Sequence, residues 1–147
     1  MGQTLAPELL PGDIFLTRNA ENSDNSTPGY WNHTAIYAGD NEVVEAQTGP
    51  AKVILTNLVD FWARYPIIKV VRMNDNTVAQ RAATHARTLI DSRYWLGASR
   101  FKLLRSSVRG ENCVSVVRRS YLYAAGINYR WKKPDDITNF PTIFIKK

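Results

Sequence analysis

Residues 33–47 read HTAIYAGDNEVVEAQ, and this stretch predicts two strands joined by a tight turn. Apolar and β-branched side chains dominate residues 33–38 and 42–47, as is typical of strands. Gly39, Asp40 and Asn41 lie between them and favour a tight turn, with glycine supplying a positive φ. The stretch therefore predicts an antiparallel hairpin with His33 at the start of one strand and Glu45 within the other.

The sequence on either side of this hairpin predicts further strands and, later in the chain, two longer helices. Short apolar runs predict strands at residues 13–17, 52–55, 67–72 and 142–145, and a short helix at residues 58–63. Apolar side chains recur with a helical period over residues 77–91. A second helix is expected from Cys113 to about Ala125, where Gly126 favours its termination. Strands that precede the main helices predict an α+β domain.

Length and composition are those of one globular domain, which we expect to span residues 1–147. With 44% hydrophobic and 22% charged residues, a chain of 147 residues can bury a sizeable core without a disulfide or metal. The single cysteine excludes an internal disulfide, and two histidines argue against a structural zinc cluster. We therefore expect neither a metal nor a cofactor.

The sequence also bears on where the chain is made. No apolar run approaches the roughly 18 residues of a membrane span, so no transmembrane segment is expected. The opening residues lack the basic and apolar regions of a signal peptide. We expect a chain that is cytoplasmic as synthesised, and any export would use a specialised secretion system that reads no cleavable peptide.

The excess of basic over acidic residues favours anionic partners. Nineteen basic and thirteen acidic residues give a formal net charge of +6, which suits nucleic acid, anionic lipid or cell-wall polymer. Residues 92–109 carry five basic residues and no acid. Such a run is either a solvated face or a patch that faces the substrate, in which Arg100 and Arg105 would bind a carboxylate or phosphate.

Cys113 has the local sequence of a candidate nucleophile. It follows Asn112, a favoured N-cap, at the start of a predicted helix. Unpaired N–H groups and the positive end of the helix dipole stabilise a thiolate there, and they supply donors for an oxyanion. The alternative is an inert cysteine packed in the core, because free cysteines are often buried.

A nucleophilic thiol needs a base, and the base needs an acceptor that orients it. His33 and Glu45 lie close to opposite each other across the predicted hairpin if the turn is at residues 39–40. A shift of one residue in the strand register would place them on different faces. Otherwise His33 is a structural histidine and Glu45 an acid at the rim of the sheet.

Four segments, taken in their order along the chain, resemble a known family. They are PGDIFLTR (11–18), WNHTAIYAG (31–39), VVEAQ (43–47) and NCVSVV (112–117). This order resembles the circularly permuted branch of the NlpC-type papain-like cysteine hydrolases, in particular its YiiX-like subgroup. There the strands that carry the histidine and the acid precede the nucleophile helix. YWLGASRF (94–101) is similar to the aromatic segment that precedes the family's cysteine.

The resemblance implies a papain-like fold, with an antiparallel sheet or small barrel packed against helices. It places the nucleophile on Cys113, the base on His33 and the third polar residue on Glu45. Tyr94 and Asn112 become candidate oxyanion or substrate contacts. The implied function is a cysteine amidase or peptidase that forms an acyl-enzyme, with cell-wall (peptidoglycan) peptides as the first substrate class and an exported lytic effector as one biological setting.

Two alternatives remain open at this point. Relatives in the permuted branch also act on acyl chains of lipids, so a lipid acyl hydrolase or acyltransferase is the enzymatic alternative. A non-enzymatic basic module that binds nucleic acid or anionic polymer would use aromatic and basic residues for stacking and phosphate contact. That module leaves the cysteine, histidine and glutamate without a role, so we do not expect nucleic acid as a partner.

Overall fold

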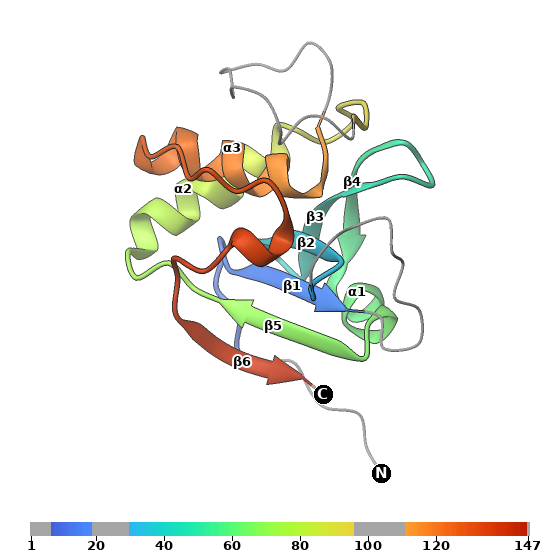
Figure 1. Ribbon diagram of the computed structural model, residues 1–147, viewed down its shortest axis with the longest axis horizontal. Coiled ribbons are helices and arrows are strands. Elements are labelled where there is room, and N and C mark those ends of the chain that lie inside the picture. Colours follow the sequence, from blue (N-terminus) through green and yellow to red (C-terminus); the bar gives the residue numbers. More distant parts are fainter. Residues whose placement is uncertain (1–6, 19–29, 96–110, 147) are drawn as a thin grey trace.

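A six-stranded antiparallel sheet forms the centre of the protein (Figure 1). The computed structural model describes residues 7–18, 30–95 and 111–146. The strands are β1 (Ile14–Arg18), β2 (His33–Gly39), β3 (Glu42–Gln47), β4 (Lys52–Asn57), β5 (Ile67–Val71) and β6 (Thr142–Lys146). Their order across the sheet is β4-β3-β2-β1-β5-β6, with β4 and β6 at the two edges. The sheet is therefore open, and of the two expected forms it is the sheet and not the small barrel.

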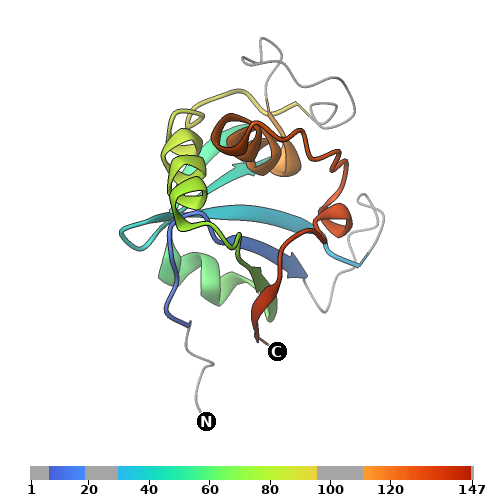
Figure 2. The ribbon, with the colours of Figure 1, turned by 90° about the vertical axis from the view of Figure 1, so that its left-hand side faces the viewer.

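Helices cover both faces of this sheet. They are α1 (Leu58–Arg64), α2 (Asn76–Arg87) and α3 (Cys113–Ala125), followed by a short 3-10 helix, Pro134–Asp136. Figure 2 shows α2 and α3 together on one side of the sheet and α1 on the other. This arrangement confirms the predicted α+β class, and the strand boundaries lie within two residues of those predicted. In the described part of the chain no helix combines the length and apolar character needed to cross a membrane.

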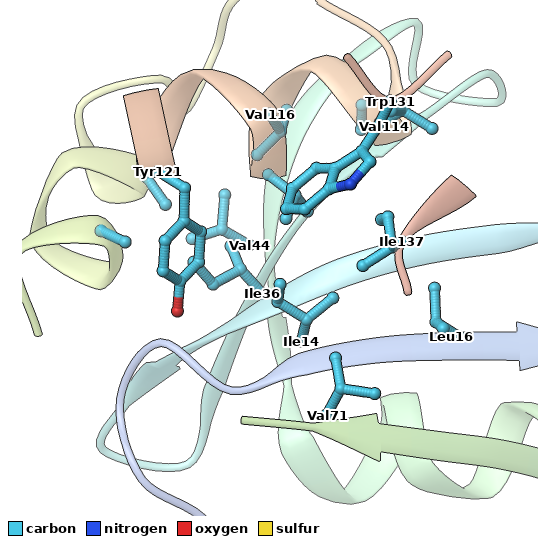
Figure 3. Packing of buried hydrophobic residues seen from close by; sticks show 14 of the residues in the cluster. Ile14, Leu16, Ile36, Val44, Val71, Val114, Val116, Tyr121, Trp131 and Ile137 are labelled. Atoms are coloured by element: carbon cyan, nitrogen blue, oxygen red, sulfur yellow. The ribbon is translucent and has the colours of Figure 1, made fainter. Parts of the chain in front are cut away.

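Strand alternation divides the buried residues into two clusters, one on each face. Figure 3 shows the larger one, where Ile14, Ile36 and Val44 from the strands meet Val116 and Tyr121 of α3. The smaller cluster lies under α1 and is built mainly from aromatic and β-branched side chains: Phe15, Ala35, Tyr37, Val43, Phe61, Trp62, Ile68 and Val70. A sheet buried on both faces explains the nearly continuous apolar runs in its strands.

The turn at Pro11 and Gly12 fixes the contact between α2 and the sheet. Gly12 has φ +97, and a Cβ built there would lie 2.3 Å from the carbonyl oxygen of Ala79 on α2. Only glycine permits both this backbone conformation and this approach. The hydroxyl of Tyr121 on α3 donates to the Gly12 carbonyl at 2.6 Å, so the turn is attached to both helices.

Helix α2 is shorter than the predicted span of residues 77–91. Asp75 caps its start by accepting from the N–H groups of Thr77 and Val78, but α-helix ends at Arg87. The hydroxyl of Thr88 donates to the carbonyl of His85 at 2.6 Å, and the N–H of Asp91 bonds instead to the carbonyl of Val53 on β4. A competing side-chain bond and a tertiary strand contact thus end the helix, although the apolar period continues.

Candidate active site

Cys113 is the first residue of α3, as the sequence predicts. Asn112 caps this helix: its side chain accepts from the N–H of Ser115 at 2.8 Å, and its own N–H donates to the Ser115 hydroxyl at 2.7 Å. This reciprocal capping box ties down the turn that carries the thiol. Among the described residues the N–H groups of Cys113 and Val114 have no hydrogen-bond acceptor. They are the donors left for a ligand at the helix start.

A buried ion pair lies directly beneath this turn. Glu111 and Arg119 are 1% and 4% exposed, and the Arg119 Nε donates to both Glu111 oxygens at 3.1 and 3.0 Å. Glu111 also accepts from the Ser115 hydroxyl at 2.8 Å. Because the helix start, its cap and this ion pair share hydrogen bonds, the position of Cys113 depends on all of them.

His33 opens β2 and faces both of its expected partners. Its Nε2 lies 2.8 Å from Oε1 of Glu45, and its ring is hydrogen-bonded to the side chain of Cys113. Burial lowers the pKa of His33, but the hydrogen bonds with Cys113 and Glu45 outweigh it and hold the pKa well above the usual value of histidine. With Nε2 donating to the carboxylate, Nδ1 is the nitrogen left to accept the thiol proton.

A β-bulge places Glu45 on the same face of the sheet as His33. The β2–β3 register pairs Ile36 with Val44 and Tyr37 with Val43, and it shifts by one residue before Gly39 pairs with Glu42. The register beyond the bulge sets Glu45 opposite Ala35, one diagonal step from His33. Without the shift Glu45 would lie opposite Ile36 and point to the other face.

Glu45 is fully buried and accepts several hydrogen bonds. Besides His33, it accepts from Gln47 at 2.6 Å and from the Thr56 hydroxyl at 2.5 Å. Nη1 of Arg64, the last residue of α1, lies 3.0 and 3.1 Å from its two oxygens. Burial would raise the pKa of Glu45, but hydrogen bonds from His33, Thr56 and Gln47 lower it to about 2. Glu45 is therefore a carboxylate throughout the neutral range.

This carboxylate makes stability depend on acid pH. A folded-state pKa of about 2, below the usual 4.5, contributes stability that is present above pH 4.5 and lost as the pH falls towards 2. We expect Glu45→Gln to remove a pH-dependent contribution of about 3 kcal/mol from the free energy of unfolding. Urea unfolding at pH 5.5 and pH 2.5 measures it. An equal change in the free energy of unfolding between these two pH values in wild type and in Glu45→Gln would contradict the expectation.

Aromatic residues and a distant carboxylate hold His33 in place. The Tyr65 ring stacks on the imidazole with centroids 6.0 Å apart and an interplanar angle of 28°. Asp135, in the 3-10 helix, accepts from the N–H groups of Tyr30 and Trp31 at 2.8 and 2.7 Å. The chain entering β2 is thus attached to a segment about a hundred residues later, which limits the movement of His33.

The structure brings Tyr94 to the site. Tyr94 and Cys113 both pack against the larger core cluster, and the Tyr94 backbone pairs with Glu111 in an isolated bridge. Burial, together with the charge of Cys113, raises the pKa of Tyr94 to about 12. The phenol therefore keeps its proton at neutral pH and can donate a hydrogen bond near the sulfur.

The remaining candidate contacts from the sequence are Asn112, Arg100 and Arg105. Asn112 uses its N–H and its side-chain oxygen to cap α3, so these two groups hold the helix and are not available to an oxyanion. Arg100 and Arg105 lie outside the described residues. Within the parts of the chain that the structure describes, no group of three or more His, Cys, Asp and Glu residues could hold a metal ion.

Gln47, Thr56 and Arg64 contact Glu45 but do not stand out in the sequence. Gln47 lies two residues after Glu45 and so shares its face, which is the signal that could have identified it. Thr56 comes within reach only through the register of β3 with β4, where Val43 pairs with Thr56 and Glu45 with Ile54. Arg64 reaches Glu45 through the position of α1, for which the sequence carries no local signal.

Comparison with solved structures places the fold among known ones. The chain is similar to the crystal structure of metalloprotein YiiX from Escherichia coli O157:H7, with a TM-score of 0.62 and 20% sequence identity. The match covers 82% of this chain and 68% of that one. At this identity the likeness shows a shared fold. A search of curated proteins found no match.

Comparison of the sequence with models of protein families found a matching family. Residues 8–135 match the family described as permuted papain-like amidase enzyme, YaeF/YiiX, C92 family. The match spans every described element up to the 3-10 helix, including the strands with His33 and Glu45 and the helix with Cys113. The chain is a member of the C92 family of permuted papain-like amidases, and with it of the cysteine peptidase hydrolases.

Proposed function

We propose that this amidase hydrolyses an amide bond with Cys113 as nucleophile, His33 as general base and acid, and Glu45 as the residue that orients His33. The observation that carries the proposal is the continuous hydrogen-bonded series from the Cys113 thiol through the imidazole to the buried Glu45 carboxylate. This is the arrangement that an activated nucleophile requires: a base within reach and a third group that orients the base.

The reaction follows from this geometry in two halves. His33 Nδ1 takes the thiol proton, and the sulfur adds to the substrate carbonyl carbon to form a tetrahedral oxyanion. His33 then gives that proton to the leaving amine as the C–N bond breaks, which leaves a thioester on Cys113. In the second half, His33 deprotonates a water molecule, which adds to the thioester and forms a second tetrahedral intermediate. When this intermediate breaks its C–S bond, the carboxylic acid leaves and the His33 imidazolium returns its proton to the sulfur.

We propose two groups as hydrogen-bond donors to the oxyanion. The N–H of Cys113 has no acceptor among the described residues and belongs to the positive end of α3. The Tyr94 phenol lies near the sulfur, and its pKa of about 12 keeps it a donor at neutral pH. We assign both as oxyanion donors, with the backbone N–H as the principal one because the capping box fixes its position.

As substrate we propose a cell-wall peptide. The family is one of amidases, and a net charge of +6 favours the carboxylates and phosphates that wall peptides and polymers carry. Action on a wall would require delivery across the cell membrane, and we propose a specialised secretion system as the route.

Product analysis tests this function. The protein is incubated separately with purified wall peptides and with phospholipid vesicles, and the products are identified by mass spectrometry beside a Cys113→Ala control. We expect wall peptides to gain one water at an amide bond, only with the intact cysteine. Release of fatty acid from the vesicles and no cleavage of the peptides would instead assign a lipid acyl hydrolase. Products that persist in Cys113→Ala would refute the proposed nucleophile.

A further inference from the structure

Arg64 contacts the site from a different layer of the fold. It is the last residue of α1, which packs on the face of the sheet opposite α3. Asn57 caps the start of α1, and Phe61 and Trp62 bury its inner side. These contacts fix the helix, so that Nη1 of Arg64 lies within 3.1 Å of both Glu45 oxygens while its side chain remains 37% exposed.

Glu45 therefore lies between two cations whenever His33 is protonated. One is the imidazolium, 2.8 Å away, and the other is the guanidinium, which stays charged at every accessible pH. The other groups facing Glu45 and His33 are Gln47 from β3, Thr56 from β4, Tyr65 directly after α1 and Cys113 from α3. The charge of Cys113 in turn acts on Tyr94. In this set Arg64 is the permanent positive charge.

We propose that Arg64 is a positioning residue that holds Glu45 for His33 and, by sharing the carboxylate, limits how strongly Glu45 stabilises the imidazolium. The inference rests on the proposed function, since it assigns Arg64 a part in the same reaction. An imidazolium held too strongly by Glu45 would be a poor acid towards the leaving amine. Arg64 neutralises part of the carboxylate charge, and its own charge repels the protonated ring, so His33 releases its proton at a lower pH than it otherwise would.

The sign of the effect makes the proposal testable. In Arg64→Gln the carboxylate keeps a possible hydrogen-bond donor but loses the cation, so the imidazolium becomes more stable. We expect the NMR titration midpoint of His33 to move up by about half to one pH unit, and the alkaline limb of kcat/KM to move with it. Turnover at pH 7 should fall about threefold, because the stabilised imidazolium protonates the amine less readily. Arg64→Lys keeps the charge and should restore the wild-type midpoint.

A second variant separates the effect of the Arg64 charge on His33 from the effect of disturbing the end of α1. Lys146 donates to the carbonyls of Trp62 and Tyr65 at 2.6 and 2.8 Å, so it supports the end of α1 without touching Glu45. Lys146→Gln removes a cation from the same helix end and should leave the His33 midpoint unchanged. The two ring signals are assigned with His85→Gln, because the chain has two histidines.

The outcomes are distinct. A midpoint that rises in Arg64→Gln and returns in Arg64→Lys supports the proposal. An unchanged or lowered midpoint in Arg64→Gln, or an equal rise in Lys146→Gln, overturns it and leaves Arg64 a structural residue. The titration needs no substrate, so it also separates this inference from the proposed function: hydrolysis that survives Cys113→Ala would remove the proposed nucleophile, whatever the His33 midpoint does.

Discussion

Replacing Cys113 by alanine is expected to lower amide hydrolysis by about 10⁴-fold or more, because the covalent step then has no nucleophile. His33, Glu45 and the helix donors would remain, but they can only assist an attack that no longer has an attacking atom. The change removes one sulfur atom from a half-buried position at the helix start. The capping box is formed by Asn112 and Ser115, so the helix itself should persist.

The measurement compares kcat/KM of wild type, Cys113→Ala and Cys113→Ser on the same amide substrate, with circular dichroism and thermal unfolding as folding controls. Cys113→Ser keeps a nucleophilic atom, but its hydroxyl is a far weaker nucleophile than a thiolate, so it should also be nearly inactive. Retention of more than a tenth of wild-type activity by a folded Cys113→Ala protein would refute the covalent mechanism.

Replacing Glu111 by alanine has the largest expected effect on stability, a loss of about 3–5 kcal/mol in the free energy of unfolding. The change deprives the buried Arg119 guanidinium of its carboxylate partner and takes an acceptor from the Ser115 hydroxyl. Taking a hydrogen-bonded carboxylate away from a buried charge costs far more than the loss of an exposed pair. The start of α3 should loosen as well, since Ser115 belongs to its cap.

An exposed ion pair provides the control. Lys52 and Asp91 lie 3.0 Å apart with side chains 47% and 73% exposed, so Lys52→Ala should cost less than about 1 kcal/mol. Urea denaturation at pH 7 measures both variants. Glu111→Gln keeps the size of the side chain, and its loss in free energy of unfolding should lie between the losses of Glu111→Ala and Lys52→Ala. If Glu111→Ala and Lys52→Ala cost the same, the ion pair beneath α3 does not support the fold.

Much of the fold could be predicted because its signals are local. Asn112 and Gly126 mark the two ends of α3, and Gly126 does adopt the left-handed conformation, with φ 72. The turn residues Gly39, Asp40 and Asn41 all have positive φ, which is what their types favour. Such signals depend on the intrinsic conformational preferences of a few neighbouring residues, so the sequence alone carries them.

What could not be predicted depends on contacts distant in sequence. The end of α2 is set partly by the bond of Asp91 to Val53 on β4, and the relation of His33 to Glu45 by a bulge between Tyr37 and Gly39. An apolar period indicates a helix but does not indicate where a competing partner ends it. The sequence of a hairpin likewise does not show whether one of its strands carries a β-bulge that shifts the register by one residue.

The residues of the site likewise divide into those that the sequence could predict and those that it could not. Cys113, His33 and Glu45 could be selected from chemistry, chain order and family resemblance, and the structure brings them together. Arg64 could not, because a basic residue at the end of a short helix usually faces solvent. Only the packing of α1 against the sheet turns it towards Glu45. The candidates Arg100 and Arg105 lie outside the described residues, and their role stays a prediction.

The central claim, that His33 activates Cys113, is tested most directly by the rate at which iodoacetamide alkylates Cys113 at pH 6 and pH 8, in wild type and in His33→Ala. Mass spectrometry follows the single cysteine of the chain without any substrate. If His33 takes the thiol proton, its removal predicts a fall of about tenfold or more in the rate at pH 6 in His33→Ala, and a smaller fall at pH 8, where part of any thiol ionises without a base. Equal rates for the two proteins at pH 6, with the fold intact, would contradict it.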